Sequence, residues 1–113
     1  MERVLGIGGV FFRARDPKAL AVWYEQHLGV TKGAWETDAG TTAFAPFGQT
    51  STKFGRDEQQ WMLNFRVRDL DAMAAQLRGA GIEVTVDPET YPYGKFARTQ
   101  DPEGNPIELW EPA

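Results

Sequence analysis

The pentapeptide FRARD at residues 12–16 returns 53 positions later as FRVRD at residues 65–69. In both copies it closes an apolar stretch and is followed by apolar residues at helical spacing. A chain that holds two copies of one unit is expected to fold as a pseudo-symmetric protein, with one module from each copy. The repeat therefore predicts two modules, at about residues 1–56 and 57–113, and places the functional site where they face each other.

The first copy predicts a strand, then a helix, then further strands. Residues 5–15 are apolar and aromatic, as in a strand. Asp16 and Pro17 are typical of the N-cap and first position of a helix, and Gly29 is typical of its end. Two or three strands are expected after this helix, up to Phe54, because glycines interrupt the sequence there.

The second copy repeats this order. Asp69 is expected to cap a helix that ends at the glycines of residues 79–81. The segment DPEGN at residues 101–105 predicts a turn, because Pro presets φ and Gly supplies a positive φ. No linker separates the copies, so we expect a single domain over residues 1–113. Strands are predicted at residues 61–67, 82–86, 96–100 and 106–111.

Composition and charge limit the function classes. The chain has 42% hydrophobic and 25% charged residues, which is ordinary for one globular domain. It has no cysteine, which excludes thiolate metal sites, thiol nucleophiles and disulfides. The net charge of −4, with dispersed Lys and Arg, argues against a nucleic-acid partner. No apolar run is long enough to span a bilayer, so we expect a cytoplasmic protein without a membrane partner.

Alternation along the predicted strands divides their side chains between two faces. One face is uniformly apolar and is expected to pack beneath the helices: Val10, Phe12, Ala14, Leu63, Phe65 and Val67. The opposite face is mixed, as in a sheet that lines a cavity: Gly9, Phe11, Arg13, Met62, Asn64 and Arg66. On the last strand, Ile107 and Leu109 point one way, whereas Glu108 and Trp110 point the other.

Three features together resemble the vicinal oxygen chelate superfamily, which includes glyoxalase I, extradiol dioxygenases and the bleomycin-resistance proteins. They are the paired units, the tail DPEGNPIELW at residues 101–110 and the helix end WYEQHLG at residues 23–29. The resemblance covers nearly the whole chain. It implies an α+β fold in which two βαβββ modules form a curved mixed sheet around a pocket, commonly in a homodimer.

Metal-using members of this superfamily hold a divalent ion with His or Glu at four symmetric positions. The resemblance maps these positions to Gly9, Gly55, Met62 and Glu108. Three of the four cannot coordinate a metal, and one carboxylate does not make a site, because divalent metals need several protein ligands. We therefore expect no cofactor, and a divalent metal is the disfavoured alternative.

Glu108 is the leading candidate for a catalytic residue. A cavity-facing carboxylate could act as a general base or bind a cationic ligand. The alternative is an acid that was retained after the metal was lost and is paired with an arginine. Arg13 and Arg66 carry guanidinium groups that suit carboxylate or phosphate ligands, although both could instead reach solvent or pair with acids.

Aromatic side chains are abundant, and core packing explains most of them. Trp110 shares a strand face with Glu108, and Trp61 precedes Met62, so one or both could form a stacking wall. Tyr93 belongs to a YPYG segment that is typical of a loop at a cavity mouth.

These features favour a small-molecule-binding protein of the glyoxalase, bleomycin-resistance and dioxygenase type, without the family metal. An organic ligand would lie in an aromatic-lined pocket, and a second copy would complete a homodimer. Ligand contacts are expected at Phe11, Arg13, Trp61, Met62, Asn64, Arg66, Tyr93, Glu108 and Trp110. One alternative is a glyoxalase- or dioxygenase-type enzyme that uses Glu108 with or without a divalent metal. Another is a scaffold whose dimer surface matters more than its pocket.

Overall fold

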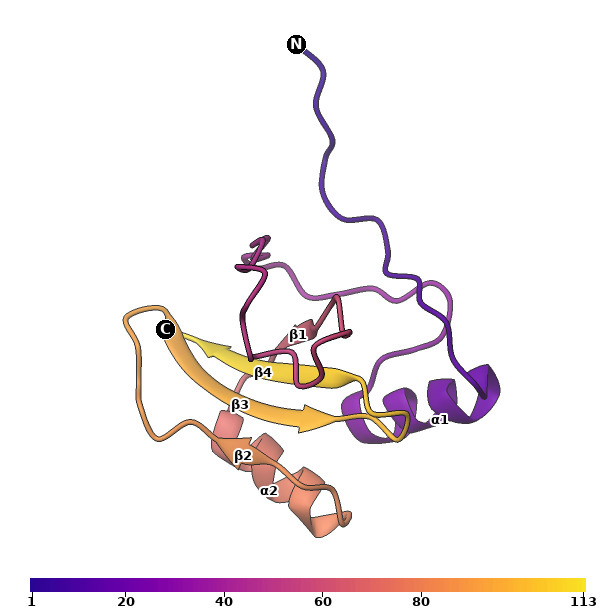
Figure 1. Cartoon of the computed structure of the whole chain (residues 1–113), viewed down its shortest axis with the longest axis vertical. Coiled ribbons are helices and arrows are strands. Elements are labelled where there is room, and N and C mark those ends of the chain that lie inside the picture. Colours follow the sequence, from indigo (N-terminus) through magenta and orange to yellow (C-terminus); the bar gives the residue numbers. More distant parts are fainter.

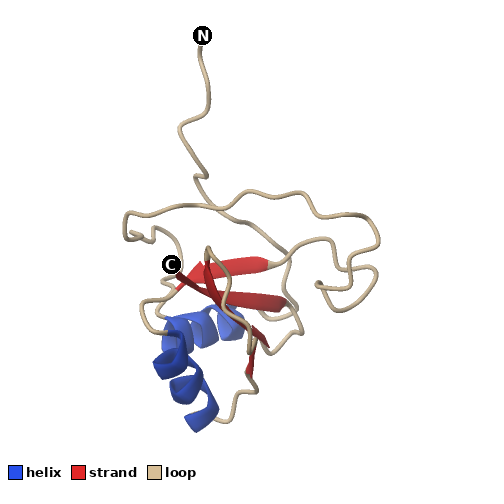
Figure 2. Ribbon diagram, turned by 90° about the vertical axis from the view of Figure 1, so that its left-hand side faces the viewer, coloured by secondary structure: helices blue, strands red, loops and turns tan.

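The computed structural model describes all residues from Met1 to Ala113. Four strands form one mixed, open sheet in the order β1-β4-β3-β2, in which β1 is parallel to β4 and the other neighbours are antiparallel. Both helices lie on one side of this sheet (Figures 1 and 2). The elements are α1 (Pro17–Leu28), β1 (Leu63–Arg66), α2 (Leu70–Gly79), β2 (Thr85–Val86), β3 (Gly94–Gln100) and β4 (Pro106–Pro112). Neither helix is long and apolar enough to cross a membrane.

Both helices begin at the aspartates that the repeat predicts. The Asp16 carboxylate accepts a hydrogen bond from the Ala19 N–H at 3.1 Å, and the Asp69 carboxylate accepts one from the Ala72 N–H at 3.0 Å. Each bond satisfies one of the N–H groups that the first turn of a helix leaves free. Helix α1 ends at Gly29, whose φ of 72° is the left-handed conformation that favours glycine.

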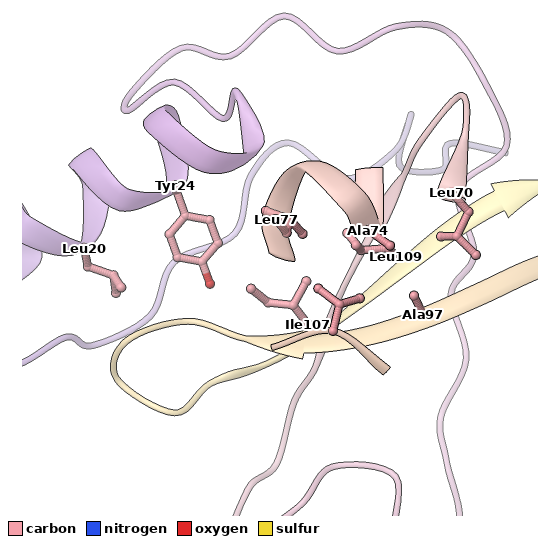
Figure 3. Packing of buried hydrophobic residues seen from close by; sticks show 9 residues of the cluster. Leu20, Tyr24, Leu70, Ala74, Leu77, Ala97, Ile107 and Leu109 are labelled. Carbon is pink, nitrogen blue, oxygen red and sulfur yellow. The ribbon is translucent and has the colours of Figure 1, made fainter. Parts of the chain in front are cut away.

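The hydrophobic core lies between the helices and the sheet (Figure 3). Ile107 and Leu109 of β4 are 1% and 0% exposed, which confirms the predicted alternation along this strand. The buried cluster comprises Leu20, Tyr24, Leu70, Ala74, Leu77, Val84, Ala97, Ile107 and Leu109. Partly buried residues of the predicted apolar face pack against it: Phe12, Ala14, Leu63, Phe65 and Val67.

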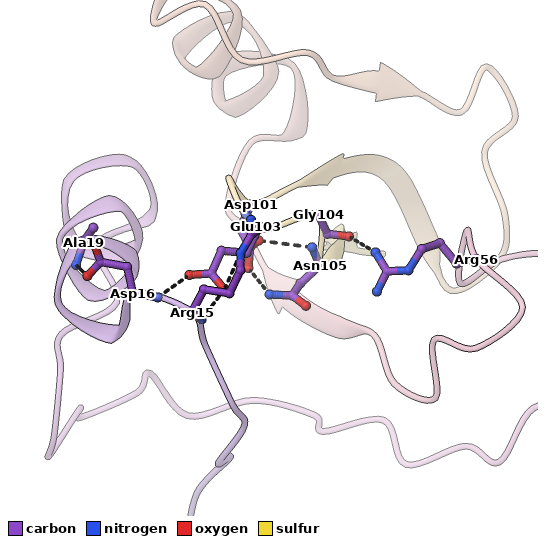
Figure 4. A network of polar contacts seen from close by, with 8 residues as sticks. All are labelled: Arg15, Asp16, Ala19, Arg56, Asp101, Glu103, Gly104 and Asn105. Carbon is purple, nitrogen blue, oxygen red and sulfur yellow. Dashed lines mark hydrogen bonds and ion pairs between the residues drawn. The ribbon is translucent and has the colours of Figure 1, made fainter.

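A buried carboxylate holds the turn between β3 and β4. Asp101 is 2% exposed and accepts hydrogen bonds from the N–H groups of Glu103 and Asn105, at 2.8 and 3.1 Å. Its second oxygen accepts from the Asn105 side-chain amide and from the Tyr24 hydroxyl, both at 2.7 Å. The hydrogen bonds within residues 101–105 confirm the predicted DPEGN turn (Figure 4). Its first residue also connects the hairpin to α1 through Tyr24.

The same turn holds the start of α1. Glu103 accepts hydrogen bonds from the N–H groups of Arg15 and Asp16, at 2.7 and 3.0 Å (Figure 4). In the second copy, Glu111 similarly accepts a hydrogen bond from the Leu70 N–H at 2.8 Å. Each helix therefore has a glutamate of the C-terminal hairpin at its N-terminal end, where a negative charge is stabilising.

The strands expected in the first copy do not form. No residue between Met1 and Met62 belongs to a strand, and the first residues project from the molecule as an extended arm (Figure 1). Val10, which was expected in the core, is 55% exposed. A strand needs a neighbour for its backbone groups, and β4 provides one only for β1 and β3. The second copy therefore forms its sheet, whereas the first copy forms only its helix.

Substitution of Asp101 by Asn is expected to lower the free energy of unfolding by about 2–3 kcal/mol, because an amide cannot accept all four hydrogen bonds and leaves buried donors unpaired. Chemical denaturation measures this change. Asp57→Asn is the control, since Asp57 is exposed and makes no hydrogen bond or ion pair. Equal stabilities of the two variants would contradict the structural role of Asp101.

Stability should also fall at alkaline pH because of Tyr24. Burial raises the pKa of its hydroxyl above the ordinary value, and the hydrogen bond to Asp101 raises that pKa further. The unfolded chain releases this proton above pH 10, whereas the folded chain retains it, so the free energy of unfolding decreases as pH rises beyond that value. Tyr24→Phe should make the decrease shallower in denaturation curves recorded over a pH series. Tyr93→Phe, which removes a hydroxyl without a hydrogen-bond partner, should retain the wild-type slope.

Candidate functional site

The sheet face that is turned away from the helices carries a polar cluster. Since Ile107 and Leu109 face the helices, Glu108 between them faces the opposite side. The strand register places Glu108 beside Asn64 on β1 and beside Arg98 on β3. Three neighbouring strands therefore contribute one polar side chain each to the same point of this face.

Both oxygens of the Glu108 carboxylate are hydrogen-bonded. Oε1 accepts from the Asn64 amide at 2.8 Å, and Oε2 accepts from the Arg98 guanidinium at 2.9 Å. The Glu108 side chain is 15% exposed and that of Arg98 is 36% exposed. The pair is electrically neutral, and its partial burial favours charge-assisted hydrogen bonds over contacts with water. The structure thus contains the arginine pairing that was the alternative to a free carboxylate.

Arg98 also connects the sheet to the coil that precedes β1. Its Nη1 donates to the Lys53 carbonyl oxygen at 2.7 Å and lies 3.7 Å from the Met62 sulfur. The sequence reasoning missed Arg98 as a site residue. The predicted turn could have indicated it. In a hairpin centred on Glu103, residues the same number of positions before and after Glu103 lie opposite each other, which pairs Arg98 with Glu108.

An aromatic cluster adjoins this polar cluster on the same face. The rings of Phe96 and Trp110 are nearly parallel, at an interplanar angle of 4° and a centroid distance of 6.3 Å. The Trp110 indole N–H donates to the Tyr93 carbonyl oxygen at 2.8 Å. Tyr91 and Tyr93 stack at 5.5 Å, and both meet Phe96 edge to face. These contacts fix the orientation of Trp110 and extend the apolar surface towards the YPYG segment.

Arg66 lies next to Trp110 across the strand register. Its Nη2 donates to the Asp38 carbonyl oxygen at 2.9 Å, and it takes part in no ion pair with a carboxylate. Its guanidinium passes so close to Gly40 that a Cβ atom there would overlap it. The cationic group of Arg66 is therefore held in place without a negative partner.

The predicted ligand contacts divide into two groups. Six of them lie on or beside this face: Met62, Asn64, Arg66, Tyr93, Glu108 and Trp110. The structure does not bring the other three to it. Phe11 is 96% exposed on the arm, Arg13 is exposed as well, and Trp61 packs against the Phe12 ring at 5.0 Å.

The residues around Glu108 do not fit a divalent metal. Its oxygens accept hydrogen bonds from the Asn64 amide N–H and from the Arg98 guanidinium. A guanidinium cannot act as a metal ligand, and the Asn64 amide presents its donor, not its carbonyl oxygen, to Glu108. The other positions implied by the family resemblance are Gly9, Gly55 and Met62, which offer no His or carboxylate side chain. No group of three or more His, Asp or Glu side chains gathers anywhere in the chain.

A hollow of the surface lies elsewhere. It has a volume of about 490 Å³ and is found beside the β3–β4 turn, where its walls include Arg15, Trp23, Glu83 and Glu103. A smaller hollow of about 280 Å³ adjoins it along α1. Neither of these two hollows is lined by Glu108 or Trp110.

Comparison with known proteins gives one family. The sequence profile of the glyoxalase-like domain matches residues 9–110. Among curated proteins there is no significant match to the chain.

Solved structures that match the chain carry related descriptions. A glyoxylase/bleomycin resistance protein/dioxygenase domain from Frankia sp. EAN1pec is 22% identical, with a TM-score of 0.62 over 98% of this chain and 100% of the other. TnmS3, an antibiotic-binding protein from Streptomyces sp. CB03234, is 24% identical, with a TM-score of 0.54 over 87% and 88%. A glyoxalase/bleomycin resistance protein from the same Streptomyces is 39% identical, but that alignment covers only 43% of this chain and 42% of the other, with a TM-score of 0.39.

The pairing of Arg98 with Glu108 should be measurable as a coupling free energy. We expect about 1 kcal/mol from a double-mutant cycle of Arg98→Ala and Glu108→Gln in chemical denaturation, because the pair is hydrogen-bonded but partly accessible to water. The control cycle uses Arg56→Ala and Glu58→Gln, whose ion pair at 3.1 Å is much more exposed and should couple by about 0–0.5 kcal/mol. Equal coupling in the two cycles would contradict a specific role for Arg98.

Proposed function

Because the chain belongs to the glyoxalase-like domain family, within the vicinal oxygen chelate superfamily, we propose that it binds a small organic molecule without the family metal. The observation that carries this proposal is the Glu108 carboxylate, whose two oxygens are bonded to Asn64 and Arg98. The positive charge next to this acid is that of an arginine side chain. A metal that took the place of Arg98 at Oε2 of Glu108 would leave the Arg98 charge unpaired.

The face around Glu108 offers two kinds of contact to a ligand. Tyr93, which is 58% exposed, and the partly exposed Phe96 ring present apolar surface that suits a planar or aromatic group, and the buried Trp110 ring lies parallel to Phe96. Arg66 has no carboxylate partner and can hold an acidic or carbonyl oxygen of the ligand. The neutral cluster of Glu108, Arg98 and Asn64 would provide polar contacts that fix the ligand orientation.

Binding alone fits Glu108 better than catalysis. A general base has to accept a proton from the substrate within hydrogen-bond reach, and both oxygens of this carboxylate are already engaged. A glyoxalase- or dioxygenase-type enzyme would first have to displace Arg98 or Asn64. TnmS3 is described as an antibiotic-binding protein, which supports a small-molecule ligand for this chain. The proposal further includes a homodimer and a cytoplasmic location, as the sequence predicts.

Ligand binding can be tested by thermal unfolding in the presence of a panel of aromatic metabolites and antibiotics that includes bleomycin. A compound present at about one hundred times its dissociation constant should stabilise the fold by about 2.7 kcal/mol and raise the Tm. Phe96→Leu and Arg66→Gln should reduce this shift, because they remove an aromatic ring of this face and a guanidinium that has no carboxylate partner. Trp23→Phe, on α1, is the matched control and should retain the shift.

The metal question is settled in the same assay with Mn²⁺, Ni²⁺ and Zn²⁺ in place of the organic compounds. We expect no rise of the Tm and no stoichiometric uptake, since Glu108 is paired internally. Uptake of one ion per chain that disappears in Glu108→Gln would overturn the metal-free proposal. A panel in which no compound raises the Tm would overturn the binding proposal and favour the scaffold alternative.

A further inference from the structure

The hollow beside the β3–β4 turn lies where three parts of the fold meet. Its walls come from residues around α1, from the segment that precedes β2 and from the turn itself. Figure 1 shows α1 next to this turn. The smaller hollow along α1 shares four wall residues with it, which are Arg15, Trp23, Pro102 and Glu103. With a volume of about 490 Å³, the larger hollow falls in the range of small-molecule pockets, roughly 300–1,000 Å³.

Trp23 is the aromatic wall that the two hollows share. The side chain is partly buried, and its ring meets the Tyr24 ring edge to face, with a centroid distance of 5.2 Å. The His27 ring lies one helical turn further along α1, at 5.4 Å. Leu20 and Pro102 add apolar surface to the smaller hollow. Contacts within α1 therefore hold an indole whose remaining surface is available to a ligand.

The walls of the larger hollow carry a negative charge. They include three carboxylates, those of Glu83, Asp101 and Glu103, and one guanidinium, that of Arg15. The Arg15 side chain is 82% exposed, and its Nε lies 3.9 Å from the nearer Glu103 oxygen. An ion pair that is so long and so accessible to water contributes little. The chain therefore supplies no firmly bound cation for this hollow.

The two carboxylates of the turn are hydrogen-bonded to neutral groups. Asp101 accepts from amide and hydroxyl donors, and Glu103 accepts from the N–H groups of Arg15 and Asp16 (Figure 4). Such donors hold the carboxylates in place, and the N-terminal end of α1 offsets only part of the Glu103 charge. Glu83 differs, because its side chain makes no hydrogen bond or ion pair.

This combination of groups favours one class of ligand. A metal ion needs several oxygens with free lone pairs, whereas hydrogen bonds already occupy the carboxylates of the turn. A primary ammonium group also needs several acceptors, since it has three donors. An alkylated ammonium ion needs none, because it is stabilised by an aromatic ring and by the surrounding negative charge.

We propose that this hollow binds an organic cation with an alkylated ammonium group. Its alkyl groups pack on Trp23 and Pro102, and its charge lies near Glu83 and the two carboxylates of the turn. None of the residues of the polar and aromatic clusters lines either hollow, so this site is separate from the face around Glu108. The inference does not depend on the proposed function.

Choline is the probe for this site. Its control is the neutral carbon analogue, in which a tert-butyl group replaces the trimethylammonium group, because the two molecules share a shape and differ in charge. In an NMR titration of the ¹⁵N-labelled full chain, choline should shift the Trp23 indole signal and the Glu83 and Gln100 amide signals, with a Kd of about 1 mM or lower. The neutral analogue should bind about tenfold more weakly or not at all.

Three outcomes of this titration would overturn the inference. They are the absence of a saturable shift with choline, equal binding of choline and its neutral analogue, and shifts that are confined to Trp110 and its neighbours. The last outcome would place the cation on the sheet face.

Variants at the walls of the hollow identify the groups that recognise the cation. Glu83→Gln removes the carboxylate without a partner and should weaken choline binding by about threefold, and the fold should persist because Glu83 is exposed. Trp23→Leu removes the ring and should weaken binding by about tenfold. Glu25→Gln is the charge-matched control, since Glu25 is an exposed acid of α1 that lines neither hollow, and it should retain binding.

A variant of the other face separates this inference from the proposed function. Phe96→Leu should retain choline binding, because Phe96 lines neither hollow. Loss of choline binding in Phe96→Leu, or equal binding by Glu83→Gln and Glu25→Gln, would contradict the cation site. Choline binding by a chain that binds no compound of the aromatic panel would contradict the proposed function alone.

Discussion

The buried carboxylate of Asp101 is the interaction on which the described fold depends most. It accepts hydrogen bonds from Glu103 and Asn105 within the turn, and from the Tyr24 hydroxyl 77 residues away along the chain. A buried charge is tolerated only when its hydrogen bonds are satisfied, and here both oxygens are shared among four donors. The turn sets the register of β3 and β4, and that register places Arg98 opposite Glu108. Asp101 therefore determines the geometry of the candidate site, although it is not one of the site residues.

Local signals in the sequence predicted local structure well. Asp16, Asp69 and Gly29 mark helix ends because capping depends on residues that are close in the chain. The DPEGN turn and the alternation along β4 are confirmed for the same reason. The strands predicted in the first copy are absent, because a strand requires a partner and sequence alternation cannot say whether one is in reach.

The candidate site shows the same division between local and long-range information. Asn64, Glu108 and Trp110 were assigned to one face from alternation alone, and the strand register places them there. Arg98 was missed, because its role depends on a cross-strand pairing that alternation within one strand does not contain. By alternation, Phe11 and Arg13 belong to the same strand face as the site residues, but they lie on the arm. Alternation does not determine which sheet, or which copy of the chain, the arm joins.

We propose that Arg98 takes the place of a metal beside Glu108. The most direct measurement is a crystal structure of the chain grown with Mn²⁺, with data collected for anomalous scattering. The predicted result is no anomalous peak near Glu108, whose carboxylate stays bonded to Asn64 and Arg98. An anomalous peak within coordination distance of the Glu108 oxygens, with the Arg98 side chain displaced, would contradict it.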